Sequence, residues 1–311
     1  MGFILGQLCS YFNQQPRPLI GFQISSSSLS GVALSSKKRK TRDSFVFHFS
    51  DDTIKPSLYN KNIGDMDRLK DIFKEGLSEM GEVDRKAALI LPELSQKTFV
   101  FSFKTIPASY QEKQKIIRFR IKKVMPIIPD DLRISFDFMD SDGEKVAVVT
   151  AAREQVVKEY EEFFKDFGIK IRVIVPPWFG LMNLVASHSQ KNFMMINADK
   201  DSFSLVIVVD MRLAFYRQKH FLFEDDKDIH GSTKAEKMAK EIMGTIHFLE
   251  DREKINVSCI WMRTGIRKGD EIVSYLRENC DFDINRIEDS PVLSFDRREK
   301  KILAPLIGLL L

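Results

Sequence analysis

The sequence predicts an α/β protein of two lobes, built by duplication of one strand meander. Residues 18–49 show strand, polar turn, strand, polar turn, strand, and the same layout returns at 192–221. Each meander is followed by a helix and then by a short apolar strand, the pattern of a strand buried on both faces. With 311 residues, the chain is also long enough for two domains. We therefore expect two related α/β lobes with a cleft between them.

The first lobe is expected at 18–92 and again at 145–191, on either side of an insert. Asp65 can cap its first helix, and Gly81 can end it. Gly168 separates a later helix from the strand that follows. The expected strands are 19–24, 29–34, 44–49, 87–92, 145–152 and 169–177, and the expected helices are 65–81, 153–167 and 178–187.

A change of residue pattern predicts a compact αβ insert at 93–144. Residues 98–104 and 133–139 alternate, with phenylalanines on one face of each expected strand. Between them lies an expected helix at 109–124 that carries many lysines and arginines. Two such strands and one basic helix form a unit small enough to be inserted in the first lobe.

The second lobe is expected at 192–291 and is shorter than the first. After its meander the sequence indicates only a helix at 234–250, a strand at 257–262 and a helix at 269–280. The closing segment 292–311 contains the apolar run LAPLIGLLL. We expect it to form a buried helix or strand that packs back on the first lobe.

Composition and charge exclude several classes of function. The chain is 43% hydrophobic and 30% charged with a net charge of +4, which is typical of a soluble globular protein and not of a dedicated nucleic-acid binder. Cys9, Cys259 and Cys280 lack metal-binding spacing and suit a reducing compartment. The histidines lack the pattern of a metal site or catalytic triad, so we expect no catalytic residue and no metal. No segment reaches the roughly 18 apolar residues of a membrane span, and the first twelve residues are expected to form either a flexible terminus or a short surface-lying helix.

The stretch GFQISSSSLSGVAL at 21–34 raises the question of nucleotide binding. A strand, a tight turn and a strand at the start of a chain often cradle a nucleotide phosphate. Such turns usually carry glycine for close backbone approach and an acid that holds a metal ion. Here the turn offers Gln23 and Ser25 instead.

Four passages, taken in their order and spacing, resemble the PilM family of type IV pilus assembly proteins, relatives of the cell-division protein FtsA in the actin-like superfamily. The resemblance extends from about residue 18 to residue 311. It implies an actin-like fold, that is, a duplicated ribonuclease H-like fold, with the αβ insert in the first lobe. The four passages are PLIGFQISSSSLSGVAL, KIIRFRIKKVMPIIPDDLRISFDFM, KVAVVTAAREQVVKEYEEFFKDFGIKIRVIVPPWFGLMNLV and LAPLIGLLL.

The first phosphate turn departs from that family. The family has Asp-x-Gly there, with a lysine five residues after the glycine, and the corresponding positions are Gln23, Ser25 and Ser30. A glutamine cannot organise a metal–water shell as a carboxylate does. Ser25 adds a side chain where the backbone would approach a phosphate.

The second phosphate turn departs as well. The family's second Asp-x-Gly corresponds to Asn197-Ala198-Asp199, where a carboxylate replaces the glycine and would repel a phosphate. The Gly-rich adenosine loop remains only as RTGIRKG at 263–269, although Lys200 and Arg267 would restore some attraction. The implied, degenerate nucleotide site consists of Gln23, Ser25, Ser26, Ser27, Ser30, Asn197, Asp199, Lys200 and Gly265. LFEDDKDIHGST, from residue 221, leads almost directly to the next helix where the family has a helical subdomain.

Three readings of function follow from the resemblance. In the first, the protein is a scaffold on the cytoplasmic side of an inner membrane, without a cofactor, and it binds the N-terminal peptide of a PilN-like membrane protein. This reading also implies a pilus motor ATPase as a further partner and self-association of the chain into rings. It implies no binding of nucleic acid. In the second, the protein is a switch that binds ATP and Mg²⁺. The third is the cytoplasmic part of an L-type subunit of type II secretion, a class that continues into a transmembrane helix which this sequence does not reach.

The helix at 109–124 is the expected site of the partner peptide, in a groove between the first lobe and its insert. It carries more cations than a packing helix needs, interleaved with apolar residues. In one interpretation the apolar groups take the peptide's side chains while arginines hold its carbonyl or carboxylate groups. In the other, the apolar groups only cover the insert's own sheet. The expected groove residues are Ile116, Arg118, Phe119, Arg120, Lys122 and Lys123.

Overall fold

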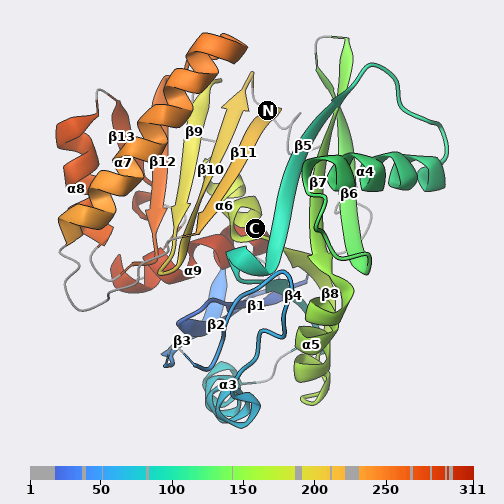
Figure 1. The fold of residues 1–311 in the computed structure, drawn as a ribbon. Coiled ribbons are helices and arrows are strands. Elements are labelled where there is room, and N and C mark those ends of the chain that lie inside the picture. The colour runs from blue at the N-terminus through green and yellow to red at the C-terminus, as the bar shows by residue number, and fades with distance from the viewer. Residues whose placement is uncertain are drawn as a thin grey trace. The chain divides into compact units, whose positions relative to one another are not determined.

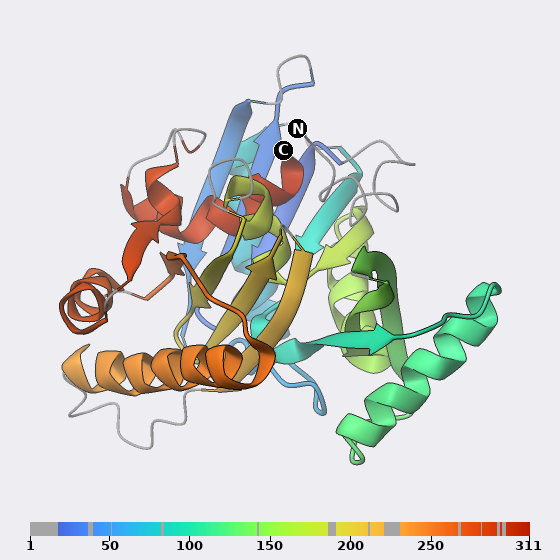
Figure 2. The same ribbon diagram turned by 90° about the horizontal axis from the view of Figure 1, so that it is seen from above.

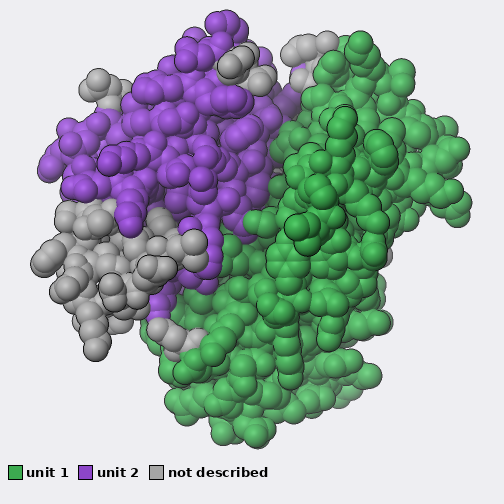
Figure 3. All heavy atoms as spheres, in the orientation of Figure 1, with its two compact units in different colours: residues 1–177, 310–311 green, residues 178–309 purple. Residues whose placement is uncertain are grey.

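A computed structural model describes residues 18–36, 40–50, 52–81, 84–141, 143–185, 191–210, 212–220, 231–266, 269–280, 282–290, 293 and 297–311. Contacts between residues divide the chain into two compact units (Figure 3). Unit 1 comprises residues 1–177 with 310–311, and unit 2 comprises residues 178–309. None of the described helices is long and apolar enough to cross a membrane.

Unit 1 contains a five-stranded sheet in the order β3-β2-β1-β4-β8 (Figure 1). Strands β1 and β2 form an antiparallel hairpin, and β1, β4 and β8 run parallel. Strand β3 begins before the expected position, because its pairing with β2 extends back to Leu34 opposite Thr41. The strands are β1 (Ile20–Ile24), β2 (Ser28–Leu34), β3 (Thr41–His48), β4 (Lys86–Ile90) and β8 (Lys170–Val175).

Two helices, α3 (Met66–Met80) and α5 (Glu154–Lys165), pack on one face of this sheet. Phe22 of β1 is fully buried there and contacts rings from both helices, with centroids 5.1 Å from Phe73 and 5.1 Å from Phe164. As the sequence predicts, the Asp65 side chain accepts the backbone N–H of Arg68 and so caps α3. Gly81 ends that helix with a φ of 63°, a conformation that favours glycine.

A second, three-stranded sheet in unit 1 has the order β5-β7-β6 and corresponds to the predicted insert. It consists of β5 (Gln96–Phe103), β6 (Leu132–Ser141) and β7 (Glu144–Arg153), preceded by the short helix η1 (Glu93–Ser95). The sequence predicts its central strand β7 as part of the first lobe, but β7 belongs to the insert because it pairs with both β5 and β6. Helix α4 (Tyr110–Val124) lies across one face, where Ile117 and Ile121 are buried against the phenylalanines of β5 (Figures 1 and 2).

Unit 2 repeats the strand layout of the first sheet. Its five strands have the order β11-β10-β9-β12-β13, with an antiparallel meander followed by two parallel strands. The two predicted meanders therefore belong to separate sheets of the same topology. The strands are β9 (Phe193–Ala198), β10 (Ser202–Val209), β11 (Arg212–His220), β12 (Cys259–Thr264) and β13 (Asp283–Arg286).

Helices α7 (Gly231–Phe248) and α8 (Gly269–Asn279) share a hydrophobic core with this sheet. The short helices η2 (Leu249–Glu253) and η3 (Ile287–Asp289) follow α7 and β13. Helices α6 (Pro177–Val185) and α9 (Arg297–Leu310) cross closely at two glycines, since a Cβ on Gly180 would lie 1.9 Å from the carbonyl oxygen of Pro305. All of α6 but its first residue and all of α9 but its last lie in unit 2, whereas the sequence predicts residues 178–191 as part of the first lobe. The packing of 292–311 on the first lobe stays a prediction.

Two predicted features lie outside the described residues. These are the N-terminal segment 1–17 and residues 221–230 of the short connection that leads to α7.

Candidate functional site

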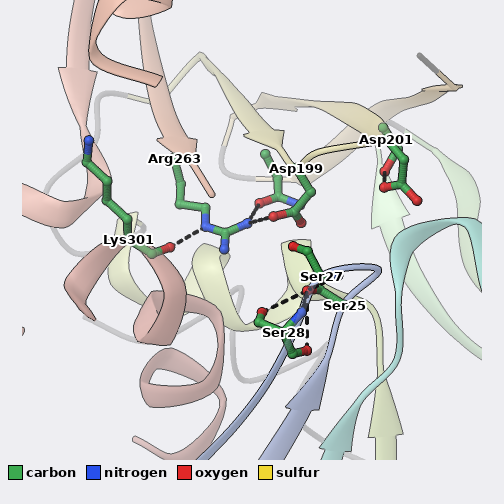
Figure 4. A network of polar contacts seen from close by, with 9 residues as sticks. Ser25, Ser27, Ser28, Asp199, Asp201, Arg263 and Lys301 are labelled. Atoms are coloured by element: carbon green, nitrogen blue, oxygen red, sulfur yellow. Dashed lines mark hydrogen bonds and ion pairs between the residues drawn. The ribbon is translucent and has the colours of Figure 1, made fainter. Parts of the chain in front are cut away.

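The turn between β1 and β2 is closed by its own serines (Figure 4). The Ser25 hydroxyl oxygen accepts the backbone N–H groups of Ser27 and Ser28, at 3.2 and 3.0 Å. It also lies 2.8 Å from the Ser28 hydroxyl, and the Ser25 backbone N–H donates to the Ser28 carbonyl at 2.9 Å. Two N–H groups that a phosphate-binding turn would present to its ligand are therefore already bonded within the turn.

Gln23 and Ser30 are paired directly across β1 and β2, so their side chains share one face of the hairpin. Both residues are buried. The Gln23 side-chain oxygen and the hydroxyls of Ser26 and Ser30 have no hydrogen-bond partner in the structure. These three predicted site residues supply polar atoms but no carboxylate, so they cannot replace the metal-organising acid of the family pattern.

The turn between β9 and β10 contains a buried ion pair that the sequence analysis did not anticipate. Arg263, on β12, lies opposite Asn197 in the parallel pairing of β12 with β9. Its Nη1 donates to Asp199 Oδ1 at 2.7 Å and to Asn197 Oδ1 at 2.9 Å (Figure 4). The two charged side chains are only 2% and 14% exposed. Asp199 thus faces a cation of its own chain. The Arg263 guanidinium offsets the repulsion expected between Asp199 and a phosphate, but it also occupies the Asp199 carboxylate at this turn.

Gly265 completes this arrangement. Its backbone N–H donates to the Ala198 carbonyl at 2.8 Å. A Cβ at this position would lie 2.3 Å from Asp199 Oδ1 and 2.8 Å from an Nη atom of Arg263. The glycine assigned by resemblance to the adenosine loop is thus required here by the ion pair. Arg267 lies outside the described residues, and the predicted site residue Lys200 lies half-buried at the β9–β10 turn.

Helix α9 joins the same network through Lys301. The Lys301 carbonyl accepts a hydrogen bond from Arg263 Nε at 2.5 Å, and its ammonium group lies 2.9 Å from Asp270 Oδ1 on α8. Arg286 of β13 also pairs with Asp270. Burial alone would raise the pKa of Asp270, but the bonds from Lys301 and Arg286 hold that pKa below its usual value.

Glu288, in η3, is the unpaired acid of this region. The residue is 1% exposed, and neither of its carboxyl oxygens has a hydrogen-bond partner among the side chains and backbone groups around it. Burial raises the pKa of Glu288, and the nearby backbone N–H of Glu288 itself and the positive charges of Lys301, Arg263 and Arg286 offset only part of that rise. Among the described residues, no three His, Cys, Asp or Glu side chains come together as a metal site requires.

The predicted peptide-binding residues of α4 have different environments. Arg118, Phe119 and Lys122 line a hollow of about 340 Å³ between α4 and residues 128–132. Arg118 donates to the Leu132 carbonyl at 2.7 Å, and Lys122 forms an ion pair of 2.6 Å with Asp130. The hollow is lined by Lys115, Arg118, Phe119, Ile121, Lys122, Ile128, Pro129, Asp130 and Leu132.

The other predicted residues of α4 do not line this hollow. The guanidinium of Arg120 lies over the rings of Phe101 and Phe103, 5.4 Å from each centroid. Ile116 is half-buried against the insert's own core, as the second interpretation of this helix predicts. Lys123 is exposed.

The similarity of this chain to known proteins lies in structure. No protein-family model matches the sequence, and no curated protein matches it. A Bacteroides thetaiotaomicron protein with an actin-like ATPase fold and unknown function is 9% identical, with a TM-score of 0.54 over 94% of this chain and 97% of that one. The ethanolamine utilization protein EutJ from Carboxydothermus hydrogenoformans is 8% identical, with a TM-score of 0.53 over 95% and 90%. The chain therefore has an actin-like fold, which confirms the predicted fold class.

A closer structural match is to one chain of a PilM–PilN type IV pilus biogenesis complex. The TM-score is 0.77, and the match covers 95% of this chain and 97% of that chain at 15% identity. At this identity the likeness establishes a shared fold, and the particular role is a separate inference.

Proposed function

We propose that this protein is an actin-like scaffold of a type IV pilus-type assembly complex. It would act on the cytoplasmic side of an inner membrane and bind the N-terminal peptide of a PilN-like membrane protein. The observation that carries this proposal is the match to a chain of the PilM–PilN complex, which includes nearly the whole of both chains. By comparison, the matches to the Bacteroides thetaiotaomicron protein and to EutJ have TM-scores of 0.54 and 0.53.

The two phosphate turns support a scaffold rather than an ATP-dependent switch. In the first, the Ser25 hydroxyl occupies two backbone N–H groups. In the second, Arg263 and Asp199 form a buried pair. A phosphate at the first turn would have to displace the Ser25 contacts. A phosphate at the second would have to break a buried ion pair, whose disruption costs about 3–5 kcal/mol when one partner is left unpaired. We therefore propose that the site has lost nucleotide binding and that the protein is not an ATPase.

The hollow beside α4 is the proposed peptide site. Its apolar lining, from Phe119, Ile121 and Ile128, can accept aliphatic side chains of a peptide. Lys115 at its margin is exposed and can pair with an acidic group. Arg118 is partly used by the Leu132 carbonyl, so it supports the hollow and is less available to a ligand.

The test is a binding titration with the fluorescently labelled N-terminal cytoplasmic segment of a PilN-like protein from the same organism. The full chain should bind it saturably. Lys115→Glu combined with Phe119→Ala removes one charged and one apolar contact of the hollow. Binding should weaken about tenfold or more, which corresponds to a loss of about 1.4 kcal/mol in binding free energy. Both side chains are exposed, so folding should be retained.

Lys104→Glu is the matched control, since Lys104 is an exposed lysine of the insert outside the hollow. This variant should bind as the wild type does. Absence of binding by the wild-type chain would refute the proposed partner. Equal binding by the wild type and the double variant would refute the site.

A further inference from the structure

Residues 128–133 form one side of the hollow beside α4, and we call this segment the wall. Its side chains contact two different elements in turn. Toward α4, Leu132 is buried in the core of the insert and Asp130 forms an ion pair of 2.6 Å with the helix. Toward α5, Asp131 and Arg133 pair with charged residues at and near the start of that helix. The wall is therefore held from both sides.

Arg133, at the start of β6, binds two carboxylates of α5 at once. Its Nε and Nη2 donate to Glu154 at 2.8 Å each, and its Nη1 donates to Glu161 at 2.6 Å. These hydrogen bonds hold the pKa of Glu154 below its usual value, so the carboxylate is charged at neutral pH. Single ion pairs on partly exposed side chains contribute little to stability, but a bidentate arginine within a network is an exception.

Arg153, at the junction of β7 and α5, makes a second link. Its Nε donates to both carboxyl oxygens of Asp131, at 2.9 and 3.1 Å, and its Nη1 donates to the Tyr59 carbonyl at 2.5 Å. The backbone N–H of Glu154 also donates to the Asp131 carbonyl at 2.7 Å. Helix α5 itself is fixed on the five-stranded sheet of unit 1, because its apolar side is buried in that core. The wall is thus tied to a rigid support.

The covalent connections of the insert do not by themselves fix its orientation. The chain enters the three-stranded sheet at Gln96 and leaves it at Arg153, and Gln96 is paired with Ala152. Two connections that lie side by side form an axis about which a small sheet can pivot. The contacts of Arg133 come from β6, the strand that carries neither connection, so they oppose such a pivot.

We propose that Arg133 and Arg153, with Asp131, Glu154 and Glu161, form an ionic lock that holds the insert on α5 and keeps the wall in place beside α4. The two arginines are then positioning residues of the hollow, because they act on it through the wall. When the lock opens, the wall is released, and a ligand of the hollow must order it again at an entropic cost. This effect on peptide affinity rests on the proposed function, whereas the lock itself does not.

The first measurement is hydrogen exchange of the full chain. In Arg133→Gln combined with Arg153→Gln, the Glu154 amide and the protected amides of residues 132–135 should exchange about tenfold faster, because local opening sets their rates. Amides of the five-stranded sheet should not change. Arg133→Lys combined with Arg153→Lys keeps both charges without the guanidinium fork, so its exchange should be intermediate.

Arg68→Gln combined with Arg85→Gln is the matched control, since both are exposed arginines of unit 1 outside the lock. This variant should exchange as the wild type does. A salt series tests the lock without any substitution. In the wild type the same amides should exchange faster as the Debye length falls from ~10 Å at 0.1 M salt to ~3 Å at 1 M.

The second measurement is the titration with the labelled N-terminal segment of a PilN-like protein. The double glutamine variant should bind about tenfold more weakly than the wild type, and the double lysine variant should lie between them. Unchanged exchange in the double glutamine variant, or no effect of salt on the wild type, would overturn the lock. Faster exchange with unchanged affinity would overturn the positioning role. If the wild type binds no peptide, the proposed function fails, and the exchange rates alone decide whether the lock exists.

Discussion

Arg263 Nε donates a hydrogen bond to the carbonyl oxygen of Lys301 at 2.5 Å. That carbonyl is available because Pro305, four residues further along α9, has no N–H to offer it. A proline inside a helix normally leaves the carbonyl four residues earlier to be hydrogen-bonded by water, and it often kinks the helix. Here the guanidinium that neutralises Asp199 also satisfies the acceptor. One arginine thus joins the filled phosphate turn to the C-terminal helix of unit 2.

Removal of Arg263 should be among the most damaging single changes in unit 2. Arg263→Ala leaves the Asp199 carboxylate buried without its cation and the Lys301 carbonyl without a donor, so we expect a loss of about 3–5 kcal/mol in the free energy of unfolding. Asp199→Ala combined with Arg263→Ala should cost less than the sum of the two single changes, because the pair is lost only once.

Urea denaturation of the wild type, the Asp199→Ala and Arg263→Ala single variants and the double variant measures this coupling. Arg42→Ala is the control, because the pair of Arg42 with Asp43 is 45% and 32% exposed and should contribute only about 0–1 kcal/mol. Additive effects of Asp199→Ala and Arg263→Ala would contradict the assignment of a coupled pair.

The first phosphate turn makes a different prediction. Ser25→Ala removes the acceptor of the Ser27 and Ser28 N–H groups, so the unfolding free energy should fall by about 1–2 kcal/mol. Hydrogen exchange of these two amides should become faster. Ser26→Ala should be neutral or slightly stabilising, because the Ser26 hydroxyl has no partner to lose. Unchanged exchange at Ser27 and Ser28 would show that the Ser25 hydroxyl does not close the turn.

The pairing of Arg263 with Asp199 could not be predicted from local sequence. Helix ends and the order of most elements follow from local patterns, and Asp65 and Gly81 lie at the predicted ends of α3. Arg263 stands at the end of an apolar strand, and its partner is 64 residues away, so no local pattern connects them. A signal was present, since a cation in a buried strand needs an acid, and Asp199 stands where the family has glycine. Strand β13 was missed because its four residues, DINR, carry no strand-like alternation.

Nucleotide binding is the sharpest test of the filled turns. Calorimetry with ATP and Mg²⁺ should give no saturable heat, because the backbone N–H groups at Ser27 and Ser28 and the space at Asp199 are occupied. Thermal denaturation gives an independent readout. At 1 mM ATP a site with a Kd of ~10 μM would add about 2.7 kcal/mol of stability. No such stabilisation is expected. Low-micromolar affinity for ATP in either assay would favour the ATP-binding switch over the scaffold.

Glu288 should make the stability of unit 2 depend on pH in an unusual direction. Its carboxyl is buried without a hydrogen-bond partner, and burial raises its pKa above the ordinary 4.5. The carboxyl is protonated in both folded and unfolded chains below about pH 4.5, so its ionisation has no effect there. As the pH rises through the folded-state pKa, the unfolded chain ionises more readily and stability is lost.

Glu288→Gln stays neutral, so its unfolding free energy should exceed that of the wild type at pH 7, by roughly 1.4 kcal/mol for each pH unit by which the folded-state pKa is raised. The difference should shrink as the pH approaches 4.5. Urea denaturation at a series of pH values measures this difference, with Glu278→Gln, at an exposed position of α8, as the matched loss of one carboxylate elsewhere in unit 2. If Glu288→Gln is less stable than the wild type at pH 7, the carboxylate is ionised in the folded protein and held by Lys301, Arg263 and Arg286, and the raised pKa is wrong.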